Sequence, residues 1–171
     1  MKAPAILASS LLVLLVMLGG CGAPAAVHAP EADPLVGSWQ SQVTFKDGPL
    51  AQVHDLEFLY AFNAGGTLTE SSNYDGAPPV PPAYGAWRRT APGHYEARYV
   101  FFNTQPPADW KAVASGGGWN PAGRGELREA IEIAADGRTY TSTLSIALFD
   151  LAGKPVEGGG TATGRGTRIG F

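Results

Sequence analysis

The feature that most constrains this chain is the alternation of side chains along its short apolar segments. One face of residues 37–45 carries Trp39, Ser41, Val43 and Phe45. Because consecutive side chains of a β-strand point to opposite faces, this spacing predicts a strand with one buried face. Similar segments recur between turn signals, and the eight predicted strands are 37–45, 53–62, 66–73, 84–90, 94–103, 125–134, 138–149 and 156–169. The sequence therefore predicts an all-β fold.

The links between the predicted strands differ in length. Those after even-numbered strands are short: 63–66, 91–93 and 135–137. Those after odd-numbered strands tend to be longer: 46–52, 74–83, 104–124 and 150–155. The pattern favours an eight-stranded antiparallel up-and-down β-barrel, in which all the longer links lie at one end and the sheet has no free edge. This is the shape of a cup. The alternative is a two-sheet sandwich built from the same strands.

The N-terminal segment has the features of a secretion signal. Lys2 precedes an almost uncharged run, Ala3 to Leu18, which is too short for a good membrane span. The run ends in Leu18-Gly19-Gly20-Cys21, which resembles the lipobox of bacterial lipoprotein precursors. The resemblance implies cleavage after residue 20 and lipidation of Cys21. The alternative is an ordinary signal with an incidental cysteine.

The lipobox resemblance sets the expected domain organisation and location. We expect a signal peptide at 1–20, a lipidated N-terminus and flexible Ala/Pro-rich tether at 21–34, and the β-barrel domain at 35–171. Acyl chains on Cys21 would hold the protein on a membrane of the bacterial cell envelope. Gly22 implies sorting to the outer membrane in a two-membraned cell; otherwise the outer face of the plasma membrane is expected. The sequence does not set the oligomeric state.

Charge and composition exclude some classes of function. Eleven basic and fifteen acidic side chains remain once Lys2 is removed with the signal, and this acidic balance argues against nucleic-acid binding. Cys21 is the only cysteine, so no intramolecular disulfide is expected. No spacing resembles a metal site, no catalytic motif is present, and we expect no cofactor.

Two motifs at the ends of the predicted barrel give a second resemblance. Gly37-Ser38-Trp39 resembles the Gly-x-Trp that opens the first strand of lipocalins. In that lipocalin-like, or calycin-like, group the tryptophan plugs the closed end of the barrel under a late basic residue, and Arg168 is similarly placed. The chain also resembles uncharacterised bacterial lipocalin-like proteins, through Gly85-Ala86-Trp87, Tyr99 to Phe102 and the Gly/Thr-rich segment from Gly160 to Ile169.

Aromatic residues are the candidate ligand-binding positions. Inside the predicted barrel these are Tyr60, Tyr99 and Phe101; in the longest loop they are Trp110 and Trp119. Tyrosine hydroxyls can orient a polar group within an apolar cavity. The alternatives are a filled interior and indoles that merely pin the loop to the barrel.

Three functions fit this sequence. The first is a membrane-anchored module whose barrel binds a small, largely apolar molecule. The second is a structural or partner-binding envelope protein with a filled barrel. The third is an isomerase- or cyclase-type enzyme for a hydrophobic substrate, which needs a titratable group in the cavity. The glutamates at positions 126, 129 and 132 are expected to form a solvated or rim set.

Overall fold

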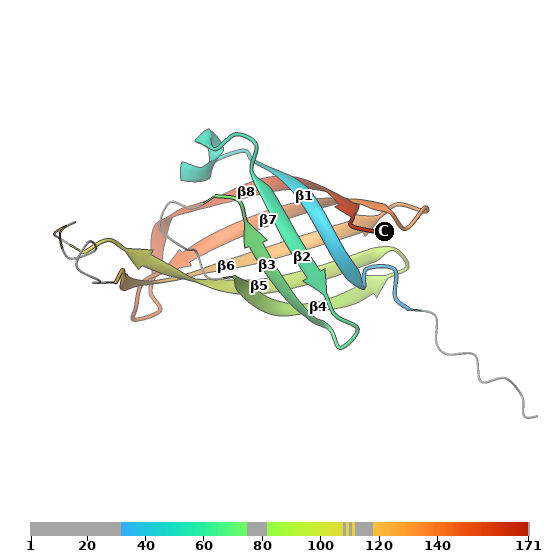
Figure 1. The fold of residues 1–171 in the computed structure, drawn as a ribbon, viewed down its shortest axis with the longest axis horizontal. Coiled ribbons are helices and arrows are strands. Elements are labelled where there is room, and N and C mark those ends of the chain that lie inside the picture. The colour runs from blue at the N-terminus through green and yellow to red at the C-terminus, as the bar shows by residue number, and fades with distance from the viewer. Residues whose placement is uncertain (1–31, 75–81, 108, 110, 112–117, 171) are drawn as a thin grey trace, which may run out of the picture. The chain divides into compact units, whose positions relative to one another are not determined.

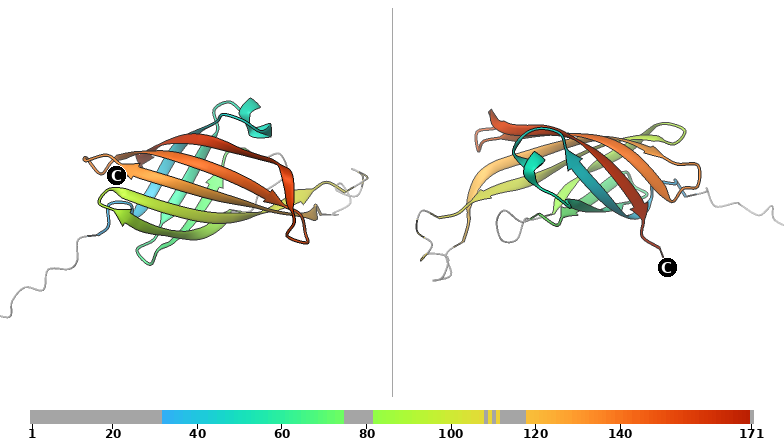
Figure 2. Two further views of the ribbon diagram at one scale, coloured as in Figure 1. Left: turned by 180° about the vertical axis from the view of Figure 1, so that it is seen from behind. Right: turned by 90° about the horizontal axis from the view of Figure 1, so that it is seen from above.

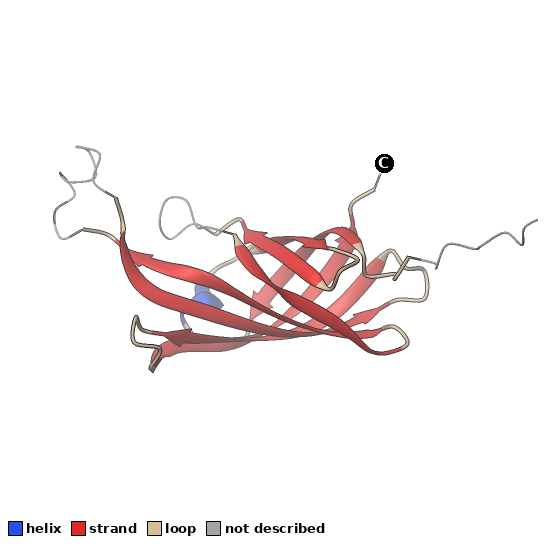
Figure 3. Cartoon of the chain, turned by 90° about the horizontal axis from the view of Figure 1, so that it is seen from below, coloured by secondary structure: helices blue, strands red, loops and turns tan. Residues whose placement is uncertain are grey.

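The computed structural model describes residues 32–74, 82–107, 109, 111 and 118–170. Figure 1 shows that strands make up nearly all of the described fold. They are β1 (Gly37–Phe45), β2 (Glu57–Phe62), β3 (Thr67–Ser72), β4 (Ala83–Ala91), β5 (His94–Gln105), β6 (Asn120–Ile133), β7 (Thr139–Phe149) and β8 (Pro155–Arg168). One short 3₁₀ helix, η1 (Pro49–Gln52), follows β1 and is drawn in blue in Figure 3. The all-β prediction is confirmed.

The eight strands close into a single antiparallel barrel in sequence order. Each strand pairs with the next, and β8 closes the sheet against β1 with Trp39 opposite Arg168 and Phe45 opposite Ala162. Figure 2 shows this sheet from behind and from above. The prediction of an up-and-down barrel is therefore confirmed, and the two-sheet sandwich is excluded.

The main errors in the predicted boundaries lie at the start of the second strand and around the longest loop. The second strand begins at Glu57 instead of residue 53, because the chain first turns through η1. Pro49 occupies the start of that helix, where the fixed φ of proline suits the helix. Its missing N–H costs nothing there, because a backbone N–H at that position has no acceptor within the helix. The predicted loop 104–124 is shorter, because β5 continues to Gln105 and β6 starts at Asn120. The two strands pair along this extension, past a register shift after Asn103.

Small residues on β8 make room for large side chains from its neighbours. Ala162, Gly164 and Gly166 are buried in the barrel. A Cβ added at Gly166 would lie 2.1 Å from a ring carbon of Tyr140 on β7. The Gly/Thr-rich C-terminal segment is thus the part of the wall against which the Tyr140 ring packs.

Trp39 and Arg168, the pair expected to close the barrel, lie in contact at the end where β1 starts and β8 stops. Trp39 is fully buried. The guanidinium carbon of Arg168 lies 4.4 Å from the centre of the indole, a cation–π contact. Arg168 also donates hydrogen bonds to the carbonyls of Gly137 (3.0 Å) and Val36 (2.8 Å). This end of the barrel is therefore packed.

Candidate functional site

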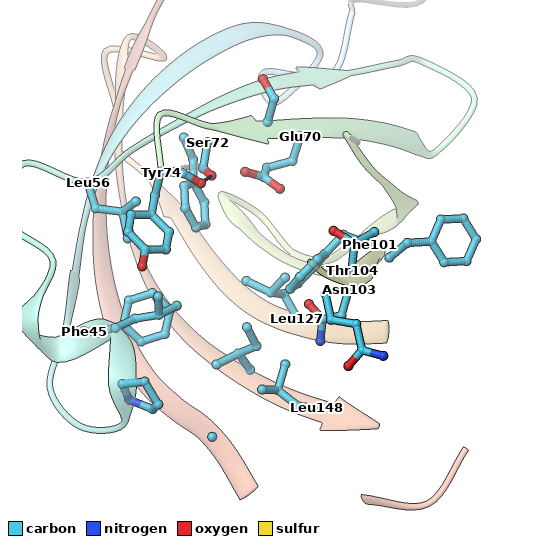
Figure 4. Close-up of a pocket in the computed structure, with 18 of the residues that line it drawn as sticks. Phe45, Leu56, Glu70, Ser72, Tyr74, Phe101, Asn103, Thr104, Leu127 and Leu148 are labelled. Carbon is cyan, nitrogen blue, oxygen red and sulfur yellow. Dashed lines mark hydrogen bonds between the residues drawn. The ribbon is translucent and has the colours of Figure 1, made fainter. Parts of the chain in front are cut away.

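A cavity of about 440 Å³ lies at the other end of the barrel, among the longer links. Volumes of this size are typical of sites for small ligands. Most of its described lining is apolar, including Phe45, Leu50, Leu56, Phe58, Phe101, Trp119, Leu127, Ile146 and Leu148. Figure 4 shows labelled members of this lining, among them Phe45, Leu127 and Leu148, converging from different strands on one space. The barrel is thus filled at one end and hollow at the other.

The lining runs from the barrel interior to the protein surface. Leu127 and Leu56 are buried, with 2% and 3% of their surface exposed. Tyr74 and Phe102 also line the cavity and are 43% and 71% exposed. An apolar molecule can therefore lose most of its contact with water while it remains reachable from the long-link end.

Glu70 is the buried acidic group in this lining. It lies on the inner face of β3, directly opposite Tyr60 on β2, with Ser72 and Phe58 forming the next inner pair toward the mouth. Only 6% of Glu70 is exposed, and its Oε1 accepts no hydrogen bond from the described residues. Figure 4 shows its carboxylate turned toward the space between the lining side chains. A buried oxygen without a donor costs free energy, which a ligand can recover.

A second buried acid, Glu129 on β6, lies in a triangle of oxygens with Tyr60 and Tyr99. The two phenolic oxygens are 3.0 Å apart, and they lie 3.0 and 3.1 Å from Oε2 of Glu129. The phenols supply two protons for these three contacts. A proton on the carboxyl supplies the third, so every contact is a hydrogen bond when Glu129 is neutral.

Burial holds both acids toward their neutral forms. Burial, with a smaller contribution from the charge of Glu129, raises the pKa of Glu70 to about 8. Burial also raises the pKa of Glu129, although the hydrogen bonds from the two tyrosines oppose this. At pH 7 Glu70 is therefore mostly protonated, and the cavity holds a carboxyl group that can either donate or accept a hydrogen bond.

The sequence-predicted aromatic residues fall into three groups. Phe101 and Trp119 line the cavity. Tyr60 and Tyr99 are buried, and their hydroxyls are occupied by Glu129 and by each other. Trp110 lies outside the described residues, as does the lipidation candidate Cys21.

The interpretation of three glutamates as a solvated or rim set was wrong for two of them. Glu129 is 3% exposed and points into the barrel. Glu126 is 9% exposed and forms ion pairs with Arg98 (2.6 Å) and Arg128 (2.9 Å). Glu132 is exposed. The signal for Glu129 was in the sequence, because it is in phase with the inward-facing Leu127 and Ile131.

Glu70 was also missed, although it is in phase with buried Leu68 on the same strand.

Among the described residues, no group of three or more His, Cys, Asp or Glu side chains could hold a metal ion. No helix in the described ranges has the length and hydropathy needed to cross a membrane. No family model matches the chain, and no curated protein matches its sequence.

Proposed function

We propose that this protein is a binding module whose barrel takes up a small, largely apolar molecule. The observation that carries the proposal is the cavity of about 440 Å³ at the long-link end, with its predominantly apolar lining. Burial of apolar surface contributes about 25 cal/mol per Å², so a molecule with a chain or ring system gains affinity from this lining. A closed eight-stranded up-and-down barrel is also compatible with the lipocalin-like fold.

Native mass spectrometry tests this proposal. Residues 22–171 include all eight strands and omit the cysteine expected to carry lipid, so they contain the complete barrel. We expect this segment, purified from bacterial cells without detergent, to carry an added mass of a few hundred daltons that denaturation removes.

A matched pair of variants locates the bound molecule. Leu148→Trp fills part of the cavity, since Leu148 lines it. Leu151→Trp places the same side chain at a position that is 70% exposed. Loss of the added mass in the first variant alone would support the proposal. Absence of any bound molecule in wild type, or equal retention in both variants, would refute it.

The proposal extends to the location of the barrel. Acyl chains on Cys21 would anchor the module to a membrane of the bacterial envelope, and residues 22–34 would act as the tether. The N-terminal fragment of the mature protein should begin at Cys21 and carry fatty acyl mass. Recovery of an unmodified mature N-terminus elsewhere would remove this part of the proposal without affecting the cavity.

A second candidate function is an isomerase or cyclase acting on an apolar substrate. The observation that favours it is Glu70, whose raised pKa, about 8, leaves a proton donor in the cavity at neutral pH. An enzyme would convert the molecule recovered in native mass spectrometry to an isomer of the same mass, and Glu70→Gln would abolish the conversion. A molecule recovered unchanged after prolonged incubation with the protein favours binding alone.

A further inference from the structure

The unpaired acceptor in the cavity gives information about its ligand. Oε1 of Glu70 is buried, accepts no hydrogen bond from the described residues, and belongs to a side chain that lines the cavity. Glu129 also has an unpaired buried Oε1, but its Oε2 is bonded by two tyrosines and the residue does not line this cavity. Glu70 is thus the acid whose unpaired oxygen a ligand in the cavity can reach.

The described lining of the cavity contains an acidic side chain but no basic one. Among the described residues that line it there is no Lys, Arg or His. A ligand carboxylate or phosphate would find no cation there, and it would be repelled by Glu70 whenever that side chain is ionised. A cationic ligand group would instead stabilise the ionised form of Glu70 by pairing with it.

We propose that the ligand is an aliphatic amine with an apolar body, whose ammonium group donates a hydrogen bond to Glu70. The inference rests on the proposed binding function and specifies the ligand class for the same cavity. Phe58 and Phe101, which also line the cavity, offer ring surfaces for the apolar body, and a ring face can also attract the ammonium.

This arrangement makes binding depend on pH. The ammonium pairs with the ionised form of Glu70, and in the empty cavity the pKa of Glu70 is about 8. Amine affinity should therefore rise about tenfold per pH unit below 8 and level off above it, until the amine itself loses its proton near pH 10.

Other titratable groups interact with Glu70 from β2 and from strands across the barrel. They are Glu129 on β6 and the phenols of Tyr60, Tyr99 and Tyr140. Burial raises the pKa of each phenol, so all three stay neutral in this range. Ionisation of Glu129 would strengthen the same trend.

Three probes of equal chain length test the inference: decylamine, 1-decanol and decanoate, titrated calorimetrically into residues 22–171 at pH 8 below their micellar concentrations. We expect decylamine to bind at least tenfold more tightly than decanol, and decanoate to bind more weakly than decanol. Glu70→Gln should bring decylamine to the affinity of decanol and leave decanol within about twofold. Glu132→Gln, a change at an exposed carboxylate on β6, should alter none of the three.

The outcomes separate this inference from the proposed function. Decanol binding without an amine preference, or an amine preference that survives Glu70→Gln, overturns the inference and leaves the cavity proposal standing. Failure of all three probes to bind overturns both. Should the Glu70→Gln variant not fold, the pH series on wild type decides: an amine affinity that is flat between pH 6 and 8 overturns the inference.

Discussion

Replacement of Glu70 by glutamine should change how the stability of the barrel depends on pH. In the folded protein the pKa of Glu70 is about 8, against the ordinary value of 4.5 in the unfolded chain. Between these values the folded state holds a proton that the unfolded state has released, so the free energy of unfolding falls as pH rises. Below pH 4.5 both states are protonated, and this penalty is absent.

The magnitude follows from the interval between the two pKa values. Each pH unit within it lowers the free energy of unfolding by about 1.4 kcal/mol, so the full interval from 4.5 to about 8 lowers it by about 5 kcal/mol. Because Glu70 is only 6% exposed, screening by water does not reduce this value much. Glutamine has a similar shape and does not titrate, so the variant avoids the penalty.

Urea unfolding of residues 22–171, followed by circular dichroism from pH 5 to pH 9, measures this effect. We expect wild type and Glu70→Gln to have similar stability at pH 5, and the variant to be several kcal/mol more stable at pH 8. Glu132→Gln should follow wild type throughout. Parallel pH profiles for wild type and Glu70→Gln would refute the reasoning, because they would show that Glu70 ionises normally in the folded state.

Two further stability predictions concern the walls of the barrel, both measured by urea unfolding. Arg168→Met removes a cation–π contact and charged hydrogen bonds to two carbonyls, and should cost about 3 kcal/mol; the exposed Arg165→Met should cost less than about 0.5 kcal/mol. Equal costs would contradict the role of Arg168. Gly166→Ala forces a methyl group against Tyr140 and should cost about 1–3 kcal/mol. Gly65→Ala, in open space, should be near neutral, and a larger loss there than at Gly166 would count against the packing account.

The fold was largely predictable because it depends on local patterns. Side-chain alternation located the eight strands, and unequal link lengths predicted which end would carry the longer loops. The start of β2 was missed, since Leu56 is in phase with Phe58, Tyr60 and Phe62, yet residues 53–56 belong to the link that contains η1 and Asp55 there has a positive φ of 56°. Local propensity does not reveal whether such a segment finds a partner strand.

The site was less predictable because it depends on contacts between distant strands. The positions of Tyr60 and Tyr99 inside the barrel follow from alternation, but their partner Glu129 is 69 residues beyond Tyr60 in the chain. Alternation also places Glu70 and Glu129 on inner faces, and this signal was available. The volume of the cavity could not be predicted from the sequence, because it depends on how glycines of β8 and large residues of β7 fit together.

The central claim is that an apolar molecule binds inside the long-link end of the barrel. Methyl and aromatic NMR spectra of residues 22–171, titrated with 1-decanol, test it most directly. The account predicts saturable shifts, with intermolecular contacts to the decanol chain, at Leu56, Phe101 and Leu127, which line the cavity. Signals of the exposed Leu151 should not move. Saturable contacts at Leu151 alone, or an unchanged spectrum at saturating decanol, would contradict the claim.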